Sequence, residues 1–325
     1  MIGAIIGDVV GSRFEWHNHK SKDFDLFKRK CHVTDDSVMS LAIALSIMQC
    51  EGDYSDLSAK AIENMQGLGK IYIKAGYGGN FIKWIMSKNP KPYNSYGNGS
   101  AMRVSACGYA AKSIKEAKEL SAKVTEVTHN HPEGMKGAEA VAVAIFLARK
   151  GKSMDKIRKH ITENYYKIDF TLDEIRDGYE FDVSCQGSVP VAFEAFFEST
   201  SFEDAIRNAI SVGGDSDTIG AITGSIAEAY YGVPEEIIGS VIKNLDSLQM
   251  KILYYFEGNY PSKAIVEDHD KVDVFTILDM YVDKIIPEGA PIEVSEDLGN
   301  GVVRANVNPQ YMVPDFSSFD KKKKW

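Results

Sequence analysis

Long apolar segments of helical character fill the first part of the chain. Residues 35–48 are apolar at nearly every position, which is typical of a helix buried on all sides, and 138–148 and 219–231 share this character. Amphipathic patterns predict six further helices, at residues 56–73, 114–127, 153–164, 189–198, 202–212 and 245–256. Because the strand-like alternation of apolar and polar residues is missing here, we expect an all-α main body over residues 1–260.

The pattern changes after residue 260, where five prolines interrupt the chain and only residues 271–286 look helical. Two alternating segments, 291–295 and 302–307, flank Gly299-Asn300-Gly301. An Asn-Gly pair between such segments favours a β-hairpin. We therefore predict a small accessory segment, 261–325, that contains a hairpin, packs on the main body and shapes a rim.

Composition excludes several classes of protein. With 44% hydrophobic and 26% charged residues, the 325-residue chain has the make-up of a soluble globular protein. Its net charge of −9 argues against generic nucleic-acid binding, which needs a basic face. The longest apolar run is too short to cross a bilayer, so we expect no membrane association. Scattered cysteines and the lack of a signal peptide indicate the cytoplasm.

Two acidic clusters, each with a threonine, are the strongest chemical signal. They are Thr34-Asp35-Asp36-Ser37 and Gly214-Asp215-Ser216-Asp217-Thr218, and each leads into an apolar helical segment. Carboxylates and hydroxyls are hard oxygen ligands that suit Mg²⁺ or Mn²⁺. Carboxylates converging on one point would repel each other unless a cation lay between them. The clusters therefore favour a metal site.

Other interpretations of these clusters are weaker. Either cluster alone could be a helix N-cap. The second is no EF-hand loop, because Ile219 and Ile226 occupy positions that need oxygen ligands. An isoprenoid synthase would need a third carboxylate after Asp35-Asp36, and Met39 stands there instead. Two His-x-His pairs lack an obvious third ligand for zinc, and no complete nucleotide-binding motif occurs.

Three more polar segments are candidates for a site. Gly7-Asp8 leads through Gly11-Ser12 to Glu15 in a short loop. The segment 97–103 is a glycine-containing turn that opens a helix, where free backbone N–H groups could hold a phosphate. The segment 128–134 is a polar turn before a buried helix. Each of these could also be purely structural.

Together and in order, these segments resemble the ADP-ribosylglycohydrolase family. The matching stretches are GDVVGSRFE at 7–15, TDDS at 34–37, GYGGNF at 76–81, GNGSAMR at 97–103, THNHPEG at 128–134 and GGDSDTIGAITGSIAEAYYG at 213–232. The resemblance covers residues 1–260; Ser37 departs from the usual threonine but keeps a hydroxyl. It implies a compact domain of orthogonally packed helices with a two-magnesium centre in a cleft, Mn²⁺ being a substitute.

The resemblance also implies roles for particular residues. Metal ligation falls on Thr34, Asp35, Asp36, Asp215, Asp217 and Thr218. Contacts to ribose and phosphate fall on Gly97, Asn98, Gly99 and Ser100, with Gly78, Gly79 and His129 as weaker candidates. Glu15 is the acidic residue of a loop near the metals and a candidate general base, and Asp36 or Asp217 bridges the ions.

The expected activity is Mg²⁺-dependent hydrolysis of the glycosidic bond between ADP-ribose and a modified acceptor. The expected partner is an ADP-ribosylated protein, with arginine as the first choice of acceptor. ADP-ribosyl-serine and a small ADP-ribosyl compound remain alternatives. A non-catalytic protein that binds ADP-ribose, or keeps the fold for structural reasons, is the alternative of another class.

Overall fold

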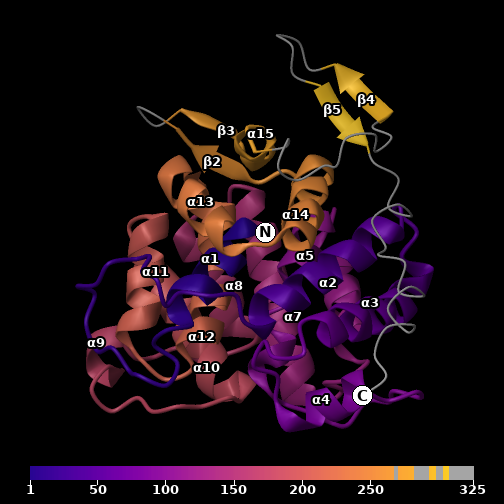
Figure 1. Ribbon diagram of the computed structural model, residues 1–325. Helices are drawn as coiled ribbons and strands as arrows, with labels where there is room; N and C mark the ends of the chain where they lie inside the picture. Colours follow the sequence, from indigo (N-terminus) through magenta and orange to yellow (C-terminus); the bar gives the residue numbers. More distant parts are fainter. Residues whose placement is uncertain (267–269, 282–292, 298–302, 307–325) are drawn as a thin grey trace.

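The protein is built mainly of helices, as the sequence predicts. The computed structural model describes residues 1–266, 270–281, 293–297 and 303–306 (Figure 1). The α-helices are α1 (Ile2–Gly11), α2 (Asp35–Gln49), α3 (Leu57–Ile71), α4 (Gly79–Ile85), α5 (Ser105–Ala110), α6 (Ile114–Thr125), α7 (Pro132–Arg149), α8 (Met154–Asn164), α9 (Leu172–Ile175), α10 (Cys185–Phe197), α11 (Phe202–Ser211), α12 (Ser216–Tyr231), α13 (Glu235–Val241), α14 (Ser247–Asn259) and α15 (Val274–Asp279). Short 3₁₀ helices are η1 (Tyr54–Asp56), η2 (Asn98–Ser100) and η3 (Ile242–Asn244).

Side-chain caps begin several of these helices where the sequence places Ser, Thr or Asp. Ser113 accepts a hydrogen bond from the backbone N–H of Glu116 at the start of α6, and Ser201 does the same for Asp204 at the start of α11. Such caps satisfy N–H groups that have no partner inside the helix. The apolar faces that follow each cap then pack into one hydrophobic core.

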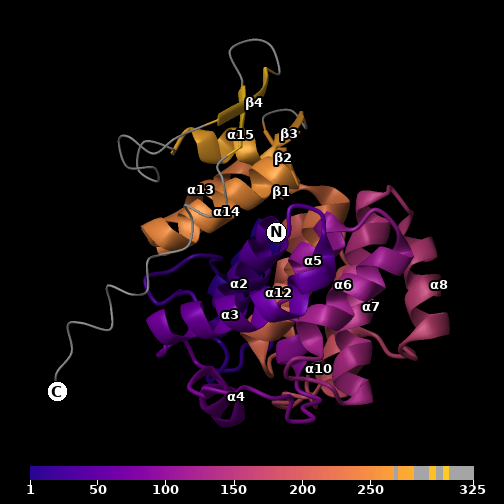
Figure 2. The ribbon, with the colours of Figure 1, turned by 90° about the vertical axis from the view of Figure 1, so that its right-hand side faces the viewer.

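The centre of the body is the close packing of α1 against α12 (Figure 2). Glycines repeat along α1: Gly3 meets Gly224 and Gly7 meets Gly220 of α12, while Gly11 meets the first turn of α12 at Ser216 and Asp217. A methyl group added at Gly7 would lie 1.9 Å from the carbonyl oxygen of Gly220. The two backbones can approach this closely only because neither residue carries a side chain. This approach brings the first turn of α12 beside the end of α1.

Several local predictions were wrong. Gly7 and Asp8 belong to helix α1 rather than to a loop, because every residue from Ile2 to Gly11 is buried and the repeated glycines pack on α12. Residues 271–273 form a strand instead of the start of a helix, since they pair with 263–265. Helix α10 begins at Cys185, earlier than predicted, with Ser184 as its cap.

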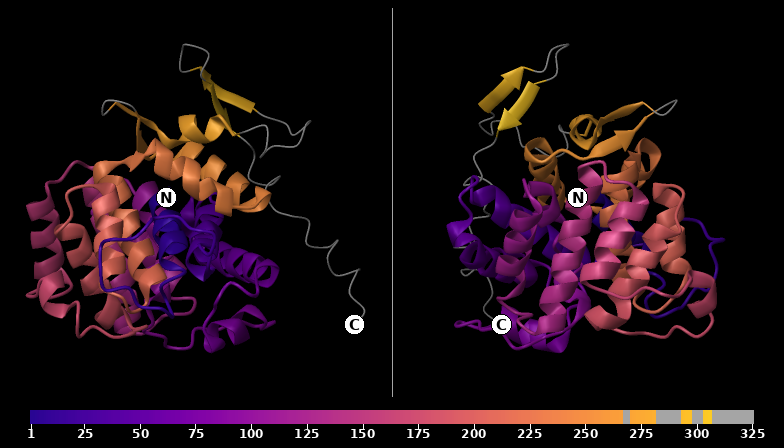
Figure 3. Two further views of the ribbon diagram at one scale, coloured as in Figure 1. Left: turned by 60° about the vertical axis from the view of Figure 1, so that its left-hand side comes forward. Right: turned by 180° about the vertical axis from the view of Figure 1, so that it is seen from behind.

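Strands occur only at one end of the described structure. Strand β1 (Val233–Pro234) pairs in parallel with β2 (Lys263–Ile265), and β2 pairs antiparallel with β3 (Lys271–Asp273). These strands and α15 lie at the opposite end of the molecule from α4 in every view (Figures 1 to 3). Described residues 263–266 and 270–281 do not line the cavity described below, so the predicted rim is not found there.

A separate antiparallel pair joins β4 (Glu293–Asp297) and β5 (Val303–Asn306). These strands fall close to the two arms of the predicted hairpin, whereas its Asn-Gly turn lies outside the described residues. No helix in the part of the chain that the structure describes has the length and apolar character needed to span a membrane.

Candidate functional site

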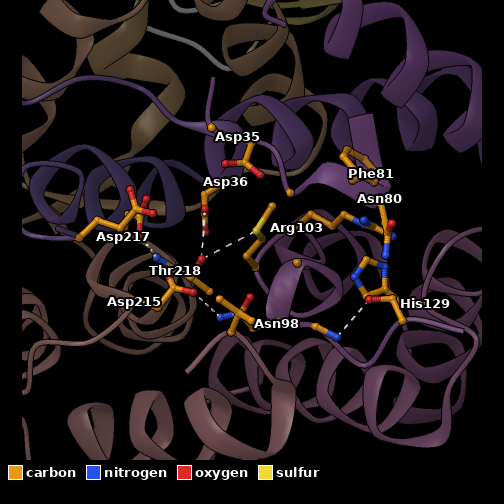
Figure 4. Close-up of a pocket in the computed structure, with 18 of the residues that line it drawn as sticks. Asp35, Asp36, Asn80, Phe81, Asn98, Arg103, His129, Asp215, Asp217 and Thr218 are labelled. Atoms are coloured by element: carbon orange, nitrogen blue, oxygen red, sulfur yellow. Dashed lines mark hydrogen bonds between the residues drawn. The ribbon is translucent and has the colours of Figure 1, made fainter. Parts of the chain in front are cut away.

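The two acidic clusters come together at the first turns of α2 and α12. Thr34 is the N-cap of α2 and Asp215 is the N-cap of α12, so the other predicted ligands follow within one turn of each helix. The hydroxyl of Thr218 donates to Oδ2 of Asp36 at 3.2 Å, which joins the clusters directly. Figure 4 shows the four aspartates and Thr218 gathered on one side of a cavity. Helix N-termini favour negative charge, so both helices suit this arrangement.

Asp8 lies behind this centre and orders the first cluster. Its buried carboxylate accepts hydrogen bonds from the backbone N–H groups of Thr34 and Ser37, both at 3.1 Å, and from the hydroxyl of Thr34 at 2.7 Å. It also accepts from the hydroxyl of Ser37. The hydroxyl of Ser37 thus donates to Asp8, which explains why a residue with a hydroxyl is needed at that position. This role of Asp8 was not among the predictions from the sequence, although a lone carboxylate within an apolar segment is a signal for it.

Glu15 completes the acidic centre from a turn after α1. One carboxylate oxygen from each of Glu15, Asp215 and Asp217 lies within 4.8 Å of the others. The loop that follows Glu15 contacts the segment that leads into α12, because the side-chain oxygen of Asn18 accepts a hydrogen bond from the N–H of Gly214 at 2.9 Å. Gly214 has a φ of 72°, a conformation that favours glycine. The structure therefore brings Glu15 together with Asp215 and Asp217 of the second cluster.

Burial and mutual repulsion set the charge state of this centre. Burial, followed by repulsion from Asp8, raises the pKa of Asp35 to about 8. The same two causes, burial first, raise the pKa of Asp36 well above its ordinary value, and burial with repulsion from Asp36 does so for Asp217. Burial and the charge of Asp215 raise the pKa of Glu15. Without a compensating cation these groups resist full ionisation.

The donor set fits a divalent cation that prefers oxygen. Oδ1 of Asp36 is buried and has no hydrogen-bond partner among the described residues. A buried, unpaired carboxylate oxygen is costly unless something binds it. The hydroxyl of Thr34 donates to Asp8 and that of Thr218 donates to Asp36, which leaves oxygen lone pairs for a cation. Neither histidine nor cysteine lies in the Glu15–Asp215–Asp217 group.

The centre lies at one end of a cavity of about 440 Å³. Among the predicted substrate contacts, Gly78, Gly79, Gly97, Asn98, Gly99 and His129 line this cavity. The amide of Asn98 donates to Asp215 at 2.7 Å, so its side chain faces the acidic end. Ser100 differs, because its hydroxyl donates to the carbonyl oxygen of Gly134 at 2.9 Å and it does not line the cavity.

The cavity walls also contain residues that the sequence reasoning did not name. Phe81, Tyr93 and Arg103 line the cavity, and the ring centroid of Tyr93 lies 6.0 Å from that of His129. Trp16 and Phe181 also line it, and their exposed side chains mark its mouth. Figure 4 shows Phe81, Arg103 and His129 on the side opposite the aspartates. Arg103 and Phe81 stood inside the matched motifs, but Tyr93 and Phe181 are in loops whose side chains carry no local signal.

Comparisons with known proteins agree with this site. A family model described as "ADP-ribosylglycohydrolase" matches residues 1–259. A curated relative, "ADP-ribosylhydrolase ARH3" of Homo sapiens, is 27% identical, and the match covers 72% of this chain and 85% of the relative. "ADP-ribosylarginine hydrolase Tri1" of Pseudomonas putida is 25% identical, with 72% and 70% covered.

A solved structure titled "ADP-ribosylglycohydrolase-related protein complex" has a similar fold. Its TM-score is 0.55 at 21% identity, with 77% of this chain and 92% of that chain covered. The family match and the curated relatives show that the protein is an enzyme that hydrolyses glycosidic bonds. The chain belongs to the ADP-ribosylglycohydrolase family, which confirms the resemblance seen in the sequence.

Proposed function

We propose that this protein is a Mg²⁺-dependent hydrolase that releases ADP-ribose from a modified side chain. The observation that carries the proposal is Oδ1 of Asp36, which is buried without a hydrogen-bond partner among the described residues and lies in a centre whose predicted ligands all offer oxygen atoms. Two Mg²⁺ ions, or Mn²⁺ in their place, would be held by Thr34, Asp35, Asp36, Asp215, Asp217 and Thr218. Both the ions and these ligand roles are part of the proposal.

The bond to the ribosyl carbon breaks through a transition state that carries positive charge on the sugar. The carboxylates of Asp36 and Asp217 stabilise this charge from one end of the cavity. Glu15, whose pKa is raised by burial, is suited to accept the proton of the attacking water. When bound, the metal ions would supply contacts to ribose hydroxyls and polarise that water. The electron pair of the broken bond leaves with the acceptor nitrogen or oxygen, which takes up a proton, so that the water ends as the new hydroxyl of ADP-ribose and the proton on the acceptor.

We propose arginine as the acceptor because of the cavity mouth. Trp16 is 73% exposed and Phe181 is 41% exposed, and their rings stack with centroids 5.2 Å apart. An exposed indole face beside carboxylates is a good surface for a guanidinium, which stacks on aromatic rings and pairs with carboxylates. The Pseudomonas putida relative is also named for ADP-ribosylarginine. Serine-linked ADP-ribose and a small ADP-ribosyl compound are the alternatives.

We propose that the enzyme acts in the cytoplasm.

The direct test is release of free ADP-ribose from two peptides, one ADP-ribosylated on arginine and one on serine. Each is incubated with Mg²⁺ and with EDTA, and the products are separated by chromatography. We expect release from the arginine-linked peptide that EDTA abolishes. Release from the serine-linked peptide alone would show that serine, and not arginine, is the acceptor. Release that persists in EDTA would contradict the proposed dependence on Mg²⁺. No release from either peptide would contradict the proposed activity on proteins.

The variant Trp16→Ala tests the acceptor contact. A guanidinium over an exposed indole face is worth about 0.5 to 1 kcal/mol, so we expect KM for the arginine-linked peptide to rise about two- to fivefold. The serine-linked peptide should change little, since serine has no cation. Trp16→Phe keeps an aromatic face and is the matched control. An equal loss with both peptides would show that Trp16 contacts ADP-ribose rather than the acceptor.

A further inference from the structure

Arg103 is a buried cation on the cavity wall. It is 1% exposed, and it forms no ion pair with any carboxylate in the described part of the chain. Its Nη2 donates to the carbonyl oxygen of Val124 at 3.1 Å and to the hydroxyl oxygen of Thr128 at 2.7 Å. A buried charge without a counter-charge is costly. The contacts of Arg103 therefore call for a functional explanation.

The bond to Thr128 determines where the threonine proton goes. A guanidinium only donates, so Thr128 accepts from Arg103 and keeps its own proton to give away. Nδ1 of His129 lies 2.7 Å from the hydroxyl oxygen, whereas the carbonyl oxygen of Thr125 lies 3.4 Å away. The shorter distance favours donation to Nδ1. Nδ1 of His129 then accepts a proton and carries none.

The surroundings of His129 favour an uncharged ring. The residue is 5% exposed, and burial, followed by the charge of Arg103, lowers its pKa well below the ordinary value. The other titratable group that faces the ring is Tyr93, with ring centroids 6.0 Å apart. A neutral imidazole that accepts on Nδ1 must hold its proton on Nε2.

Nε2 of His129 faces the glycine turn of the cavity. A methyl group at Gly97 would lie 3.6 Å from this nitrogen, and one at Gly99 would lie 3.5 Å away. Both glycines and His129 line the cavity, and Figure 4 shows His129 on the side away from the aspartates. A ligand atom that rests on the glycine turn would therefore meet Nε2.

We infer that Arg103, acting through Thr128, holds His129 as the tautomer protonated on Nε2, so that the ring can donate a hydrogen bond to the substrate at the ribose and phosphate contact that the sequence resemblance already implies for His129. Arg103 and Thr128 are positioning residues in this arrangement, and His129 makes the contact. The positive charge of Arg103 polarises the chain of hydrogen bonds toward the cavity. The identity of the ligand, ADP-ribose, rests on the proposed function, but the tautomer does not.

Nuclear magnetic resonance of the whole protein with ¹⁵N-labelled histidine tests the tautomer directly. The signals of His129 are assigned by their loss in His129→Asn, and nitrogen shifts distinguish a protonated from an unprotonated ring nitrogen. We expect Nε2 to be protonated and Nδ1 unprotonated between pH 6 and 8. Thr128→Val should let the form protonated on Nδ1 appear beside the Nε2 form, and Thr128→Ser, which keeps the hydroxyl, should suppress that form again. Protonation on Nδ1 in the natural protein would overturn the inference.

Calorimetric binding of ADP-ribose supplies the functional measurement. A hydrogen bond to a charged oxygen is worth enough for Thr128→Val to weaken binding about tenfold, with Thr128→Ser close to the natural protein. Circular dichroism of each variant checks that the fold is retained, and the spectrum of the natural protein decides the tautomer even if Thr128→Val does not fold. The Nε2 tautomer without any ADP-ribose binding would contradict the proposed function and leave the tautomer established. Unchanged affinity in a folded Thr128→Val would overturn the role of the relay in binding.

Discussion

At the residue scale, the fold holds the carboxylate of Asp36 in an energetically unfavourable environment. One of its oxygens accepts a hydrogen bond from Thr218, while the other is buried without a partner among the described residues. Burial and then the nearby charges of Asp8 and Asp35 oppose its ionisation. Such a buried, uncompensated carboxylate destabilises the metal-free protein, and a cation that binds it increases the stability of the folded state.

The variant Asp36→Asn should therefore separate stability from function. Because it removes one of several repelling charges, we expect the melting temperature in EDTA to stay level or rise. Mg²⁺ affinity should fall at least tenfold, since a carboxylate ligand is lost, and release of ADP-ribose should fall by about 10² or more. Calorimetry and the peptide assay measure these effects. The matched control is Asp169→Asn, an exposed residue paired with Lys167. Unchanged Mg²⁺ affinity in Asp36→Asn would refute its metal role.

At the scale of elements, the site depends on how α1 packs against α12. The repeated glycines of α1 allow the two backbones to meet, and this places Asp8 behind Thr34 while Asp217 lies near the end of α1. The distance between α1 and α12 therefore sets the positions of the carboxylates in the acidic centre. The local sequence indicates neither, because a Gly-Asp pair is equally common in turns.

Gly7→Ala should disturb both stability and activity. The added methyl group would lie 1.9 Å from the carbonyl oxygen of Gly220, which is backbone and cannot rotate away. We expect a loss of about 3 kcal/mol in the free energy of unfolding, measured by urea denaturation, and weaker Mg²⁺ binding. Gly178→Ala is the control, because an added methyl group there meets no atom within 4 Å. Equal stability of the two variants would show that the close approach is unimportant.

At the scale of the whole molecule, the acidic centre couples folding to pH and to metal. The folded, metal-free protein raises the pKa of Asp35 from 3.8 to about 8, so between these values it holds a proton that the unfolded chain has lost. Folding then takes up protons, and stability in EDTA falls as the pH rises through this window. Mg²⁺ competes with those protons for the carboxylates.

Thermal melting in EDTA and in Mg²⁺ at pH 5.5 and pH 8 checks this coupling. We expect Mg²⁺ to raise the melting temperature at both values and by more at pH 8, where fewer protons compete for the carboxylates. Asp36→Asn should show a smaller Mg²⁺ effect. A Mg²⁺ effect that is equal or larger at pH 5.5 would contradict carboxylate ligation.

The sequence by itself determined the helical class, most helix positions and the family. Apolar periodicity and caps such as Ser113 and Ser201 are local features that survive into the fold. The two acidic clusters were recognisable because carboxylates and hydroxyls stand together within a few residues of the chain. Their roles as metal ligands remain predictions, as do those of the glycine turn at 97–100 and the boundary at residue 260.

Only the tertiary structure decided which distant residues support that chemistry. Asp8 reaches Thr34, and Arg103 reaches Thr128, across different elements, so no spacing in the sequence predicts these contacts. Trp16 and Phe181 likewise meet from two separate loops at the cavity mouth. Burial, unpaired polar atoms and shifted pKa values arise when the chain packs against itself, because they depend on what surrounds a group in space rather than along the chain.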